Sequence, residues 1–314
     1  MEKERYDVIV AGAGPGGMAC ALYAARAGFS VVAIDQGAPG GQMTMTEKID
    51  NYPGFPDGVD GNELAELMLK QTQRFGAEIA YGFITGVEKK DDGNIIVKLD
   101  EESVSCRAFV IATGAAPKEL GVPGESKLRG RGVSYCAVCD GFFFKGQQVC
   151  VIGGGDAAVE EAVYLSNLCA KVTVIHRRDK LRAAKHAIDA ALAHENIEFA
   201  LNTKVLAVNG ADGVESLRVA DAVSGAERDI PCTGVFMYVG VNPISEFVRG
   251  AIEIDDYGFI KTSDEMETNI KGIYAVGDVR RPRNRQVATA VSDGATAALS
   301  IERVLNQQPD RFRK

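Results

Sequence analysis

The sequence predicts an α/β fold with two Rossmann-like dinucleotide-binding domains, the second inserted in the first, and three observations carry this prediction. Residues 12–17 (GAGPGG) form a glycine-rich loop between an apolar run and an alanine-rich segment. Residues 153–158 (GGGDAA) form a second loop in the same setting. A third apolar run, residues 272–278, lies near the C-terminus with no phosphate loop after it. Strand, glycine loop, helix and strand in this order are typical of a βαβ dinucleotide-binding unit.

The first copy begins with residues 6–11 (YDVIVA), whose β-branched run predicts a buried parallel strand. After the loop, residues 18–27 are rich in alanine and are expected to form a helix that Gly28 ends. Residues 30–34 (SVVAI) predict the second strand, with Asp35 at its end.

The second copy repeats this pattern. Residues 148–152 predict a strand, residues 157–168 a helix and residues 171–175 a second strand. The two copies also keep one register. Gly14 precedes Asp35 by 21 positions (35 − 14), and Gly155 precedes His176 by 21 (176 − 155).

The strand expected near the C-terminus indicates that the second copy is an insertion in the first domain. Turn residues at 113–117 and 240–243 mark the two expected crossings. The predicted domains are residues 1–115 with 245–314, and residues 116–244.

Composition limits the possible functions. The 314 residues carry a net charge of −8, with a pI of about 5.1, which argues against a nucleic-acid partner. No apolar run approaches the ~18 residues that span a bilayer. Residues 1–7 are charged and lead into a strand, so we expect no signal peptide and a cytoplasmic protein.

The chain has seven cysteines, and only two of them are closely spaced. An odd number without a secretory signal argues against a structural disulfide framework. Without a second cysteine pair, and with three histidines, a zinc site is not expected. The other five cysteines are expected to be buried.

The first loop suits a pyrophosphate. Gly12, Gly14 and Gly17 allow a tight turn, close approach of the phosphates, and helix–strand packing. The following helix directs its N-terminus at the phosphates, and Asp35 can accept hydrogen bonds from the hydroxyls of an unmodified ribose. The alternative is a glycine-rich turn with a solvated aspartate.

The second loop has Ala158 as its third small residue, a common variant of the motif. His176, Arg177 and Arg178 stand where the first copy has Asp35, and Arg182 follows. Guanidinium groups bind a 2′-phosphate that a carboxylate would repel, so NADPH is preferred over NADH. The alternative is a basic run that only solvates the surface.

Between the loops, Cys136 and Cys139 are spaced to form a disulfide, and two thiols match the two electrons of a hydride. Asp140 can donate or accept a proton for a thiol or a reduced flavin. The alternatives are two inert core cysteines and an aspartate that caps a helix or turn.

These motifs resemble those of the low-molecular-weight thioredoxin reductase family over nearly the whole chain. That family's redox centre commonly reads Cys-Ala-Thr-Cys-Asp, and residues 136–140 read CAVCD. The other segments that carry the resemblance are 40–42 (GGQ), 51–54 (NYPG), 112–114 (ATG), 153–156 (GGGD), 176–178 (HRR), 277–278 (GD) and 285–286 (RQ).

The resemblance implies a homodimer in which FAD binds the outer domain and NADPH the inserted one. It also implies rotation between the two domains, for which the two crossings act as hinges. NADPH reduces FAD, FAD reduces the Cys136–Cys139 disulfide, and this pair reduces thioredoxin. Cys139 faces the flavin, Cys136 attacks thioredoxin, and Asp140 is the acid–base group. Asp278 binds the ribityl chain, and Arg285, Gln286 and Val287 lie near the isoalloxazine.

The candidate FAD residues are Gly12, Gly14, Pro15, Gly17, Asp35, Gly41, Gln42, Asn51, Thr113, Gly114, Asp278, Arg285, Gln286 and Val287. The candidate NADPH residues are Gly153, Gly155, Asp156, Ala157, Ala158, Glu160, His176, Arg177, Arg178 and Arg182.

Three features depart from the family pattern. Val138 replaces a usual threonine, Ala157 replaces a serine or threonine, and residues 280–283 (RRPR) are more basic than expected. Two other functions stay open. One is a related flavoprotein, either a dithiol oxidase or a reductase of a peroxiredoxin-type partner. The other is a non-catalytic NADPH sensor, which needs neither the cysteine pair nor a second FAD segment.

Overall fold

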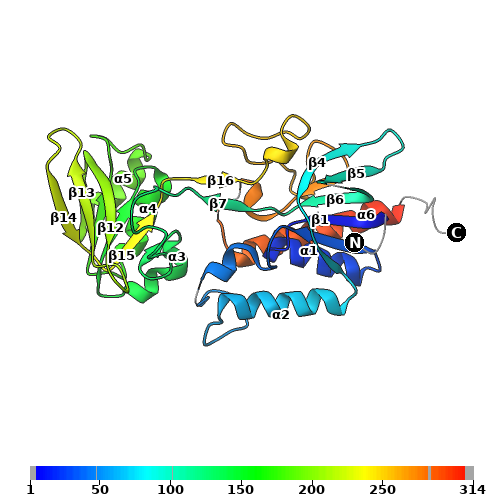
Figure 1. The fold of residues 1–314 in the computed structure, drawn as a ribbon, viewed down its shortest axis with the longest axis horizontal. Helices are drawn as coiled ribbons and strands as arrows, with labels where there is room; N and C mark the ends of the chain where they lie inside the picture. The colour runs from blue at the N-terminus through cyan, green and yellow to red at the C-terminus, as the bar shows by residue number, and fades with distance from the viewer. Residues whose placement is uncertain (1–4, 47, 101, 282–283, 308–314) are drawn as a thin grey trace. The chain divides into compact units, whose positions relative to one another are not determined.

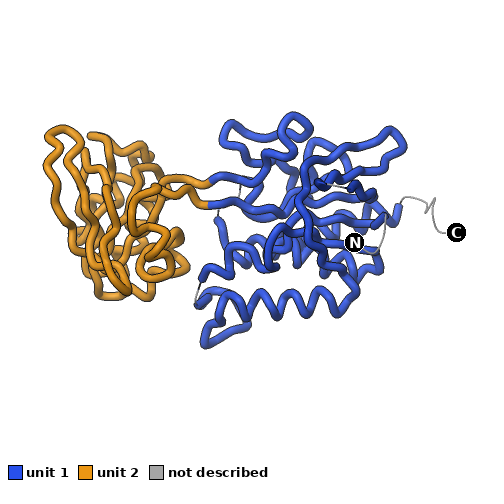
Figure 2. The backbone as a smooth tube through the Cα atoms, viewed as in Figure 1, with its two compact units in different colours: residues 1–116, 242–314 blue, residues 117–241 orange. Residues whose placement is uncertain are grey.

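The computed structural model describes residues 5–46, 48–100, 102–281 and 284–307. The chain divides into two units (Figure 2). Unit 1 is Met1–Ala116 with Asn242–Lys314, and unit 2 is Pro117–Val241. These bounds differ by one to three residues from the domain limits expected from the sequence.

Unit 1 is built on a seven-stranded sheet with the order β3-β2-β1-β6-β5-β4, in which β17 also pairs with β6 (Figure 1). The strands are β1 (Arg5–Ala11), β2 (Val31–Asp35), β3 (Glu78–Tyr81), β4 (Ile84–Lys89), β5 (Ile95–Leu99), β6 (Ser103–Ile111) and β17 (Ile273–Ala275). Strands β3, β2, β1, β6 and β17 run parallel, whereas β4 and β5 pair antiparallel. The parallel part has the strand order of a dinucleotide-binding fold.

Alternate side chains of β1 face opposite sides of this sheet, as the period of a strand requires. Val8 and Val10 are fully buried against the helices of unit 1, in a cluster with Ala21, Ala24 and other residues of α1 and α6. Ile9 and Ala11 belong to a second cluster on the other face. Both faces of β1 are therefore covered, which explains its unbroken apolar run.

The helices of unit 1 are α1 (Pro15–Arg26), α2 (Gly61–Arg74) and α6 (Val287–Gln307), with short 3₁₀ turns η1 (Gly41–Met45), η3 (Glu246–Val248) and η4 (Gly277–Val279). Helices α1 and α6 cross closely, because a Cβ at Gly294 would lie 2.2 Å from Gly16 O. The first and last helices thus pack in one unit. Helix α1 begins three residues before the predicted start, since Pro15 suits the first turn.

Unit 2 holds a five-stranded sheet with the order β11-β10-β9-β15-β8, all of whose pairs are parallel. The strands are β8 (Val133–Ser134), β9 (Gln148–Ile152), β10 (Lys171–Ile175), β11 (Ile197–Ala200) and β15 (Gly234–Met237). The other elements are α3 (Ala137–Asp140), η2 (Gly141–Phe144), α4 (Asp156–Ser166), α5 (Lys185–Leu192) and the antiparallel sheet of β12 (Thr203–Asn209), β13 (Ser216–Asp221) and β14 (Glu227–Pro231).

The two crossings form a small ribbon of their own. Strand β7 (Ala115–Pro117) pairs with β16 (Val241–Pro243). Ile244 N donates to Gly114 O at one end of this ribbon, and Lys118 N donates to Gly240 O at the other. Both crossings lie at the turn residues from which they were predicted.

Two further predictions concern the free cysteines and membrane-spanning helices. Cys20, Cys106, Cys150, Cys169 and Cys232 are free and buried, which confirms their expected place in the core. None of the helices that the structure describes has the length and apolar content of a membrane span.

Candidate active site

Two glycines of the first loop, Gly12 and Gly17, are packed so closely that neither admits a side chain. Gly12 has a φ of +103°, and a Cβ there would lie 2.5 Å from Ala112 O. A Cβ at Gly17 would lie 2.0 Å from Gly12 O. Gly14, the N-cap of α1, makes no side-chain cap, so the first N–H groups of this helix are open to a ligand.

Asp35 is fixed at this loop by its own carboxylate. Its Oδ2 accepts from Ala13 N at 2.6 Å, and its Oδ1 accepts from Gly37 N at 2.9 Å. Each oxygen retains a lone pair for a further donor. The arrangement fits the predicted bond to ribose hydroxyls.

Several distant predicted residues of unit 1 meet at the same loop. Gly41 approaches Gly14, because a Cβ at Gly41 would lie 3.2 Å from Gly14 Cα. Gln42 follows on η1. Val287, the first residue of α6, packs in a cluster with Met18 of α1.

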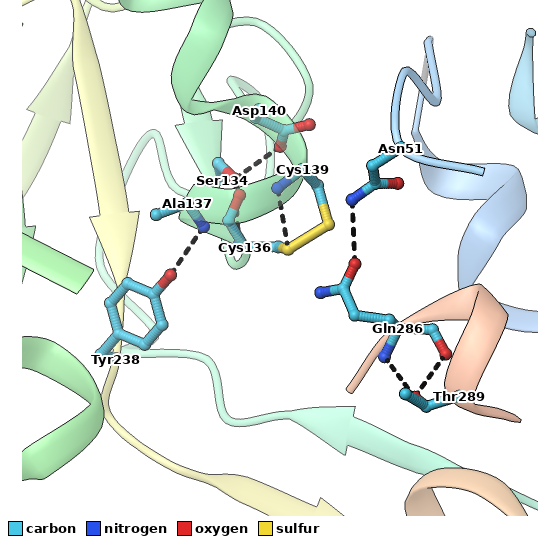
Figure 3. Close-up of a disulfide and its surroundings, with 9 residues drawn as sticks. All are labelled: Asn51, Ser134, Cys136, Ala137, Cys139, Asp140, Tyr238, Gln286 and Thr289. Atoms are coloured by element: carbon cyan, nitrogen blue, oxygen red, sulfur yellow. Dashed lines mark hydrogen bonds between the residues drawn. A yellow bond between two sulfur atoms is a disulfide. The ribbon is translucent and has the colours of Figure 1, made fainter. Parts of the chain in front are cut away.

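Asn51 and Gln286 form a direct pair (Figure 3). Asn51 Nδ2 donates to Gln286 Oε1 at 2.9 Å. Thr289 braces Gln286, since its hydroxyl accepts from Gln286 N at 3.2 Å and donates to Gln286 O at 3.0 Å. Two segments named only from the resemblance are therefore in contact.

The remaining candidates of unit 1 have separate surroundings. Thr113 Oγ1 donates to Ile244 O at 2.6 Å. This hydrogen bond holds Thr113 at the crossing, next to Gly114. Asp278 lies on η4, and burial raises its pKa to about 6, an effect that Arg285 opposes. The guanidinium of Arg285 lies over the ring of Phe259, 5.3 Å from its centroid.

Some residues of the second glycine loop are closely packed, whereas others face open space. A Cβ at Gly153 would lie 2.7 Å from the Cβ of Ala158, which is buried against the sheet. A Cβ at Gly155 would meet no atom of the described chain within 4 Å. Ala157 and Glu160 are exposed on α4. Gly155, the N-cap of α4, therefore has open space beside it.

Of the four candidate residues in the basic segment that follows β10, one is buried and three are exposed. His176 is buried at 6 % exposure, with its ring against Gly154. Burial lowers the pKa of His176, and the charges of Arg182 and Arg178 lower it further. Arg177, Arg178 and Arg182 are exposed, and no ion pair joins them to any residue in the described ranges.

Cys136 and Cys139 form a disulfide, with their Cα atoms 5.3 Å apart (Figure 3). Cys136 is the N-cap of α3, and its Sγ accepts from Cys139 N at 3.2 Å. Both cysteines are partly exposed, unlike the five free ones. A helix N-terminus stabilises negative charge, so a thiolate at Cys136 is favoured once the bridge is reduced.

Asp140 accepts a hydrogen bond from Ser134 Oγ to its Oδ2 at 2.5 Å. Burial raises the pKa of this carboxyl, while the Ser134 bond acts in the opposite direction. Asp140 is the N-cap of η2 but makes no side-chain cap. It therefore acts neither as the predicted alternative cap nor as an ordinary surface acid, and it can hold a proton near the thiols.

Three side chains that the sequence reasoning missed are connected to the redox motif, directly or through one another. Ser134 holds Asp140, and the hydroxyl of Tyr238 accepts from Ala137 N at 2.7 Å, inside the redox motif. Burial raises the pKa of Tyr238, and the charge of Glu161 raises it further. Glu161 has a pKa raised to about 7, first by burial and then by Glu160, and its buried Oε2 has no partner in the described structure.

Ser134 precedes Cys136 by two residues, so a search for hydroxyls beside the motif would have found it. Tyr238 follows a buried strand 101 residues away in sequence from Ala137, and no local pattern marks it.

Comparisons with known proteins show the family of this chain. The profile of the pyridine nucleotide-disulphide oxidoreductase family matches residues 6–294. A thioredoxin reductase of Bacillus subtilis (strain 168) is 45% identical over 311 residues, 98% of this chain and 96% of the relative. One from Listeria monocytogenes serovar 1/2a is 44% identical over 308 residues, 98% and 96% of the two chains. The crystal structure of thioredoxin reductase from Streptococcus pyogenes MGAS5005 is 44% identical, covers 97% and 99% of the chains and has a TM-score of 0.93.

Proposed function

Since this chain belongs to the pyridine nucleotide-disulphide oxidoreductases and, within them, to the thioredoxin reductase family, we propose that it catalyses the NADPH-dependent reduction of the thioredoxin disulfide. FAD and NADPH are the cofactors, and when bound they supply the two-electron chemistry that side chains lack. One observation carries the proposal. The Cys136–Cys139 disulfide lies at the start of α3, in a chain with two dinucleotide loops.

The residues of unit 1 fit FAD. The open N-terminus of α1 and the glycines around it leave room for a pyrophosphate. Asp35 has acceptor capacity left for a ribose. Asp278 is a half-buried carboxyl with a raised pKa and no hydrogen-bond partner in the described part of the chain, which suits the hydroxyls of a ribityl chain.

The residues of unit 2 fit NADPH. The N-terminus of α4 has no side-chain cap, and Gly155 leaves space in front of it. Arg177, Arg178 and Arg182 present exposed guanidinium groups that suit a 2′-phosphate. We therefore assign FAD to unit 1 and NADPH to unit 2.

The redox centre performs thiol–disulfide exchange. In the reduced centre, the thiolate of Cys136 attacks one sulfur of the thioredoxin disulfide, and a mixed disulfide forms. Cys139 then attacks Cys136 Sγ, which restores the Cys136–Cys139 bond and releases both thioredoxin sulfurs, reduced by two electrons. Burial raises the pKa of Asp140, which favours proton uptake by this carboxyl beside the thiols and assigns it the acid–base role.

An exposed apolar surface at the redox motif supports a protein partner. Phe142, Phe143 and Val138 are 61%, 43% and 39% exposed, within four residues of Cys139. Aromatic side chains are enriched at protein–protein interfaces. These residues are assigned to contact with thioredoxin.

The proposal extends to assembly and location. A homodimer and a cytoplasmic protein agree with the family resemblance, and the net charge of −8 disfavours nucleic acid. Light scattering of the purified flavoprotein measures the dimer directly.

The test of the proposed function compares acceptors. NADPH oxidation is measured with a panel of thioredoxins, with hydrogen peroxide and with oxygen alone. Turnover that depends on thioredoxin is expected. Equal turnover with oxygen alone would indicate a dithiol oxidase instead, and a colourless protein would indicate a sensor.

A variant tests the role of the first cysteine. Cys136→Ser is expected to abolish thioredoxin reduction and to leave bleaching of the flavin by NADPH intact. Cys169→Ala, at a buried free cysteine, is the matched control and should keep both. Thioredoxin turnover that persists in Cys136→Ser would refute the assignment.

A further inference from the structure

Three consecutive backbone N–H groups fasten the end of the basic segment to the second glycine loop. Arg182 N and Ala183 N both donate to Gly154 O, at 2.6 and 3.1 Å. Ala184 N donates to Asp156 Oδ1 at 2.7 Å. The segment that carries the arginines is therefore held at the loop that faces the nucleotide phosphates.

Asp156 supplies the side-chain part of this connection. Ala184 is the N-cap of α5 and has no side chain that could cap the helix. Asp156, the first residue of α4, accepts from the N–H of that N-cap across 28 positions of sequence. A residue of the same helix commonly provides this bond in a capping box. Here a different helix provides it, so the two helix starts are tied together.

The His176 ring explains why the loop and the segment fit in one register. A Cβ at Gly154 would lie 2.4 Å from His176 Nδ1, so the ring stacks directly on the loop. The depressed pKa of His176 keeps the ring neutral at pH 7. Binding of a phosphate is then left to the three exposed arginines.

The charge of Asp156 needs a separate reason. A carboxylate at the N-terminus of α4 is favourable for the helix, but it repels the phosphates of any dinucleotide bound there. Direct affinity for the nucleotide therefore does not account for this residue. Its hydrogen bond to Ala184 does.

We infer that Asp156 is a positioning residue that sets the preference for a 2′-phosphorylated nucleotide. Its oxygen holds Ala184, and through it the arginine segment, in register with the glycine loop. This reassigns Asp156, which the sequence pattern placed in contact with the nucleotide. The inference rests on the proposed function, because it presumes that unit 2 takes NADPH.

The test measures binding by calorimetry on the purified flavoprotein, with adenosine 2′,5′-bisphosphate and 5′-AMP as probes. These differ only in the 2′-phosphate. Asp156→Ala is expected to lower the affinity ratio of the two probes about tenfold, the scale of one charge-assisted hydrogen bond. Asp156→Asn keeps an acceptor oxygen and should stay within about twofold of the wild type. Asp189→Ala, which removes an exposed charge on α5, should leave the ratio unchanged.

Steady-state kinetics give a second readout. KM for NADPH should rise in Asp156→Ala while kcat is kept, and KM for NADH should not rise. Equal weakening of both probes would overturn the inference, and so would an Asp156→Asn variant that behaves like Asp156→Ala. If the wild type itself shows no preference for the 2′-phosphate, the NADPH assignment fails as well. If the wild type shows the preference and Asp156→Ala retains it, only the inference fails.

Discussion

Asn51 Nδ2 donates a hydrogen bond to Gln286 Oε1 at 2.9 Å, although the two residues are 235 positions apart in sequence. Gln286 is itself held by the hydroxyl of Thr289 on α6. The contact connects the N-terminal and C-terminal parts of unit 1 at the residues assigned to the flavin. The hydrogen bond holds these two side chains in one relative position.

This pair predicts an energetic coupling in FAD binding. Asn51→Ala and Gln286→Ala should each weaken FAD binding. The double variant should lose less binding free energy than the sum of the two single losses. A coupling of about 1 kcal/mol is expected for one hydrogen bond. FAD dissociation constants of the four proteins, measured by flavin fluorescence, form the cycle. Strict additivity would mean that the pair does not act together.

Gly155 predicts a variant that harms binding without harming the fold. Its φ of −95° is open to alanine, and an added Cβ meets no described atom within 4 Å. Gly155→Ala should therefore keep the thermal midpoint of the wild type and weaken NADP⁺, because the methyl group enters the space given to the pyrophosphate. Gly153→Ala is the contrast. Its Cβ would lie 2.6 Å from Tyr238 O, so this variant should lose stability. Unchanged NADP⁺ affinity in Gly155→Ala would contradict the placement of the pyrophosphate beside Gly155.

Arg177 and Arg178 predict cofactor selectivity. Changing both to alanine should raise KM for NADPH by one to two orders of magnitude, about the loss of two charge-assisted bonds after solvent screening. KM for NADH should change little, since NADH has no 2′-phosphate. Arg228→Ala, an exposed arginine on β14, serves as the control. An equal loss for both nucleotides would contradict the 2′-phosphate assignment.

Glu161 predicts a pH-dependent gain in stability. Its pKa in the folded protein is raised from 4.5 to about 7, so the folded state disfavours the charged form. The loss of folding stability that ionisation of this carboxyl causes is absent below pH 4.5, grows as the pH rises and is complete above pH 7. Glu161→Gln should thus unfold like the wild type at pH 4 and be more stable at pH 8. Denaturant unfolding at both pH values measures the difference, with the exposed Glu195→Gln as the control. A gain of the same size at pH 4 would point to packing instead of ionisation.

Much of the fold could be predicted because local patterns carry it. The strands at residues 148–152 and 171–175 have the predicted bounds, because each is a buried apolar run. Helix α4 runs from Asp156 to Ser166, close to the predicted 157–168. The cysteine pair was also predictable, since its members are three residues apart and form the disulfide within one helical turn.

The connections within the site could not be predicted in the same way. The hydrogen bonds from Ala137 N to Tyr238 and from Ala184 N to Asp156 join residues that no sequence period relates. The pKa of Glu161 depends on burial, which the pattern of one helix does not determine. Such contacts arise only when strands and helices from distant segments are brought together.

The crossing of α1 and α6 has a consequence for synthesis on the ribosome. Unit 2 is one continuous stretch, whereas unit 1 lacks β17 and α6 until residues 273–307 have been made, after the whole of unit 2. Until then Val8 and Val10 lack the apolar packing that Ala297 and Ile301 later provide. Nascent domains generally fold in the order in which they emerge. Here the inserted domain is complete first, and the sheet of the host domain keeps apolar side chains uncovered until β17 and α6 have emerged.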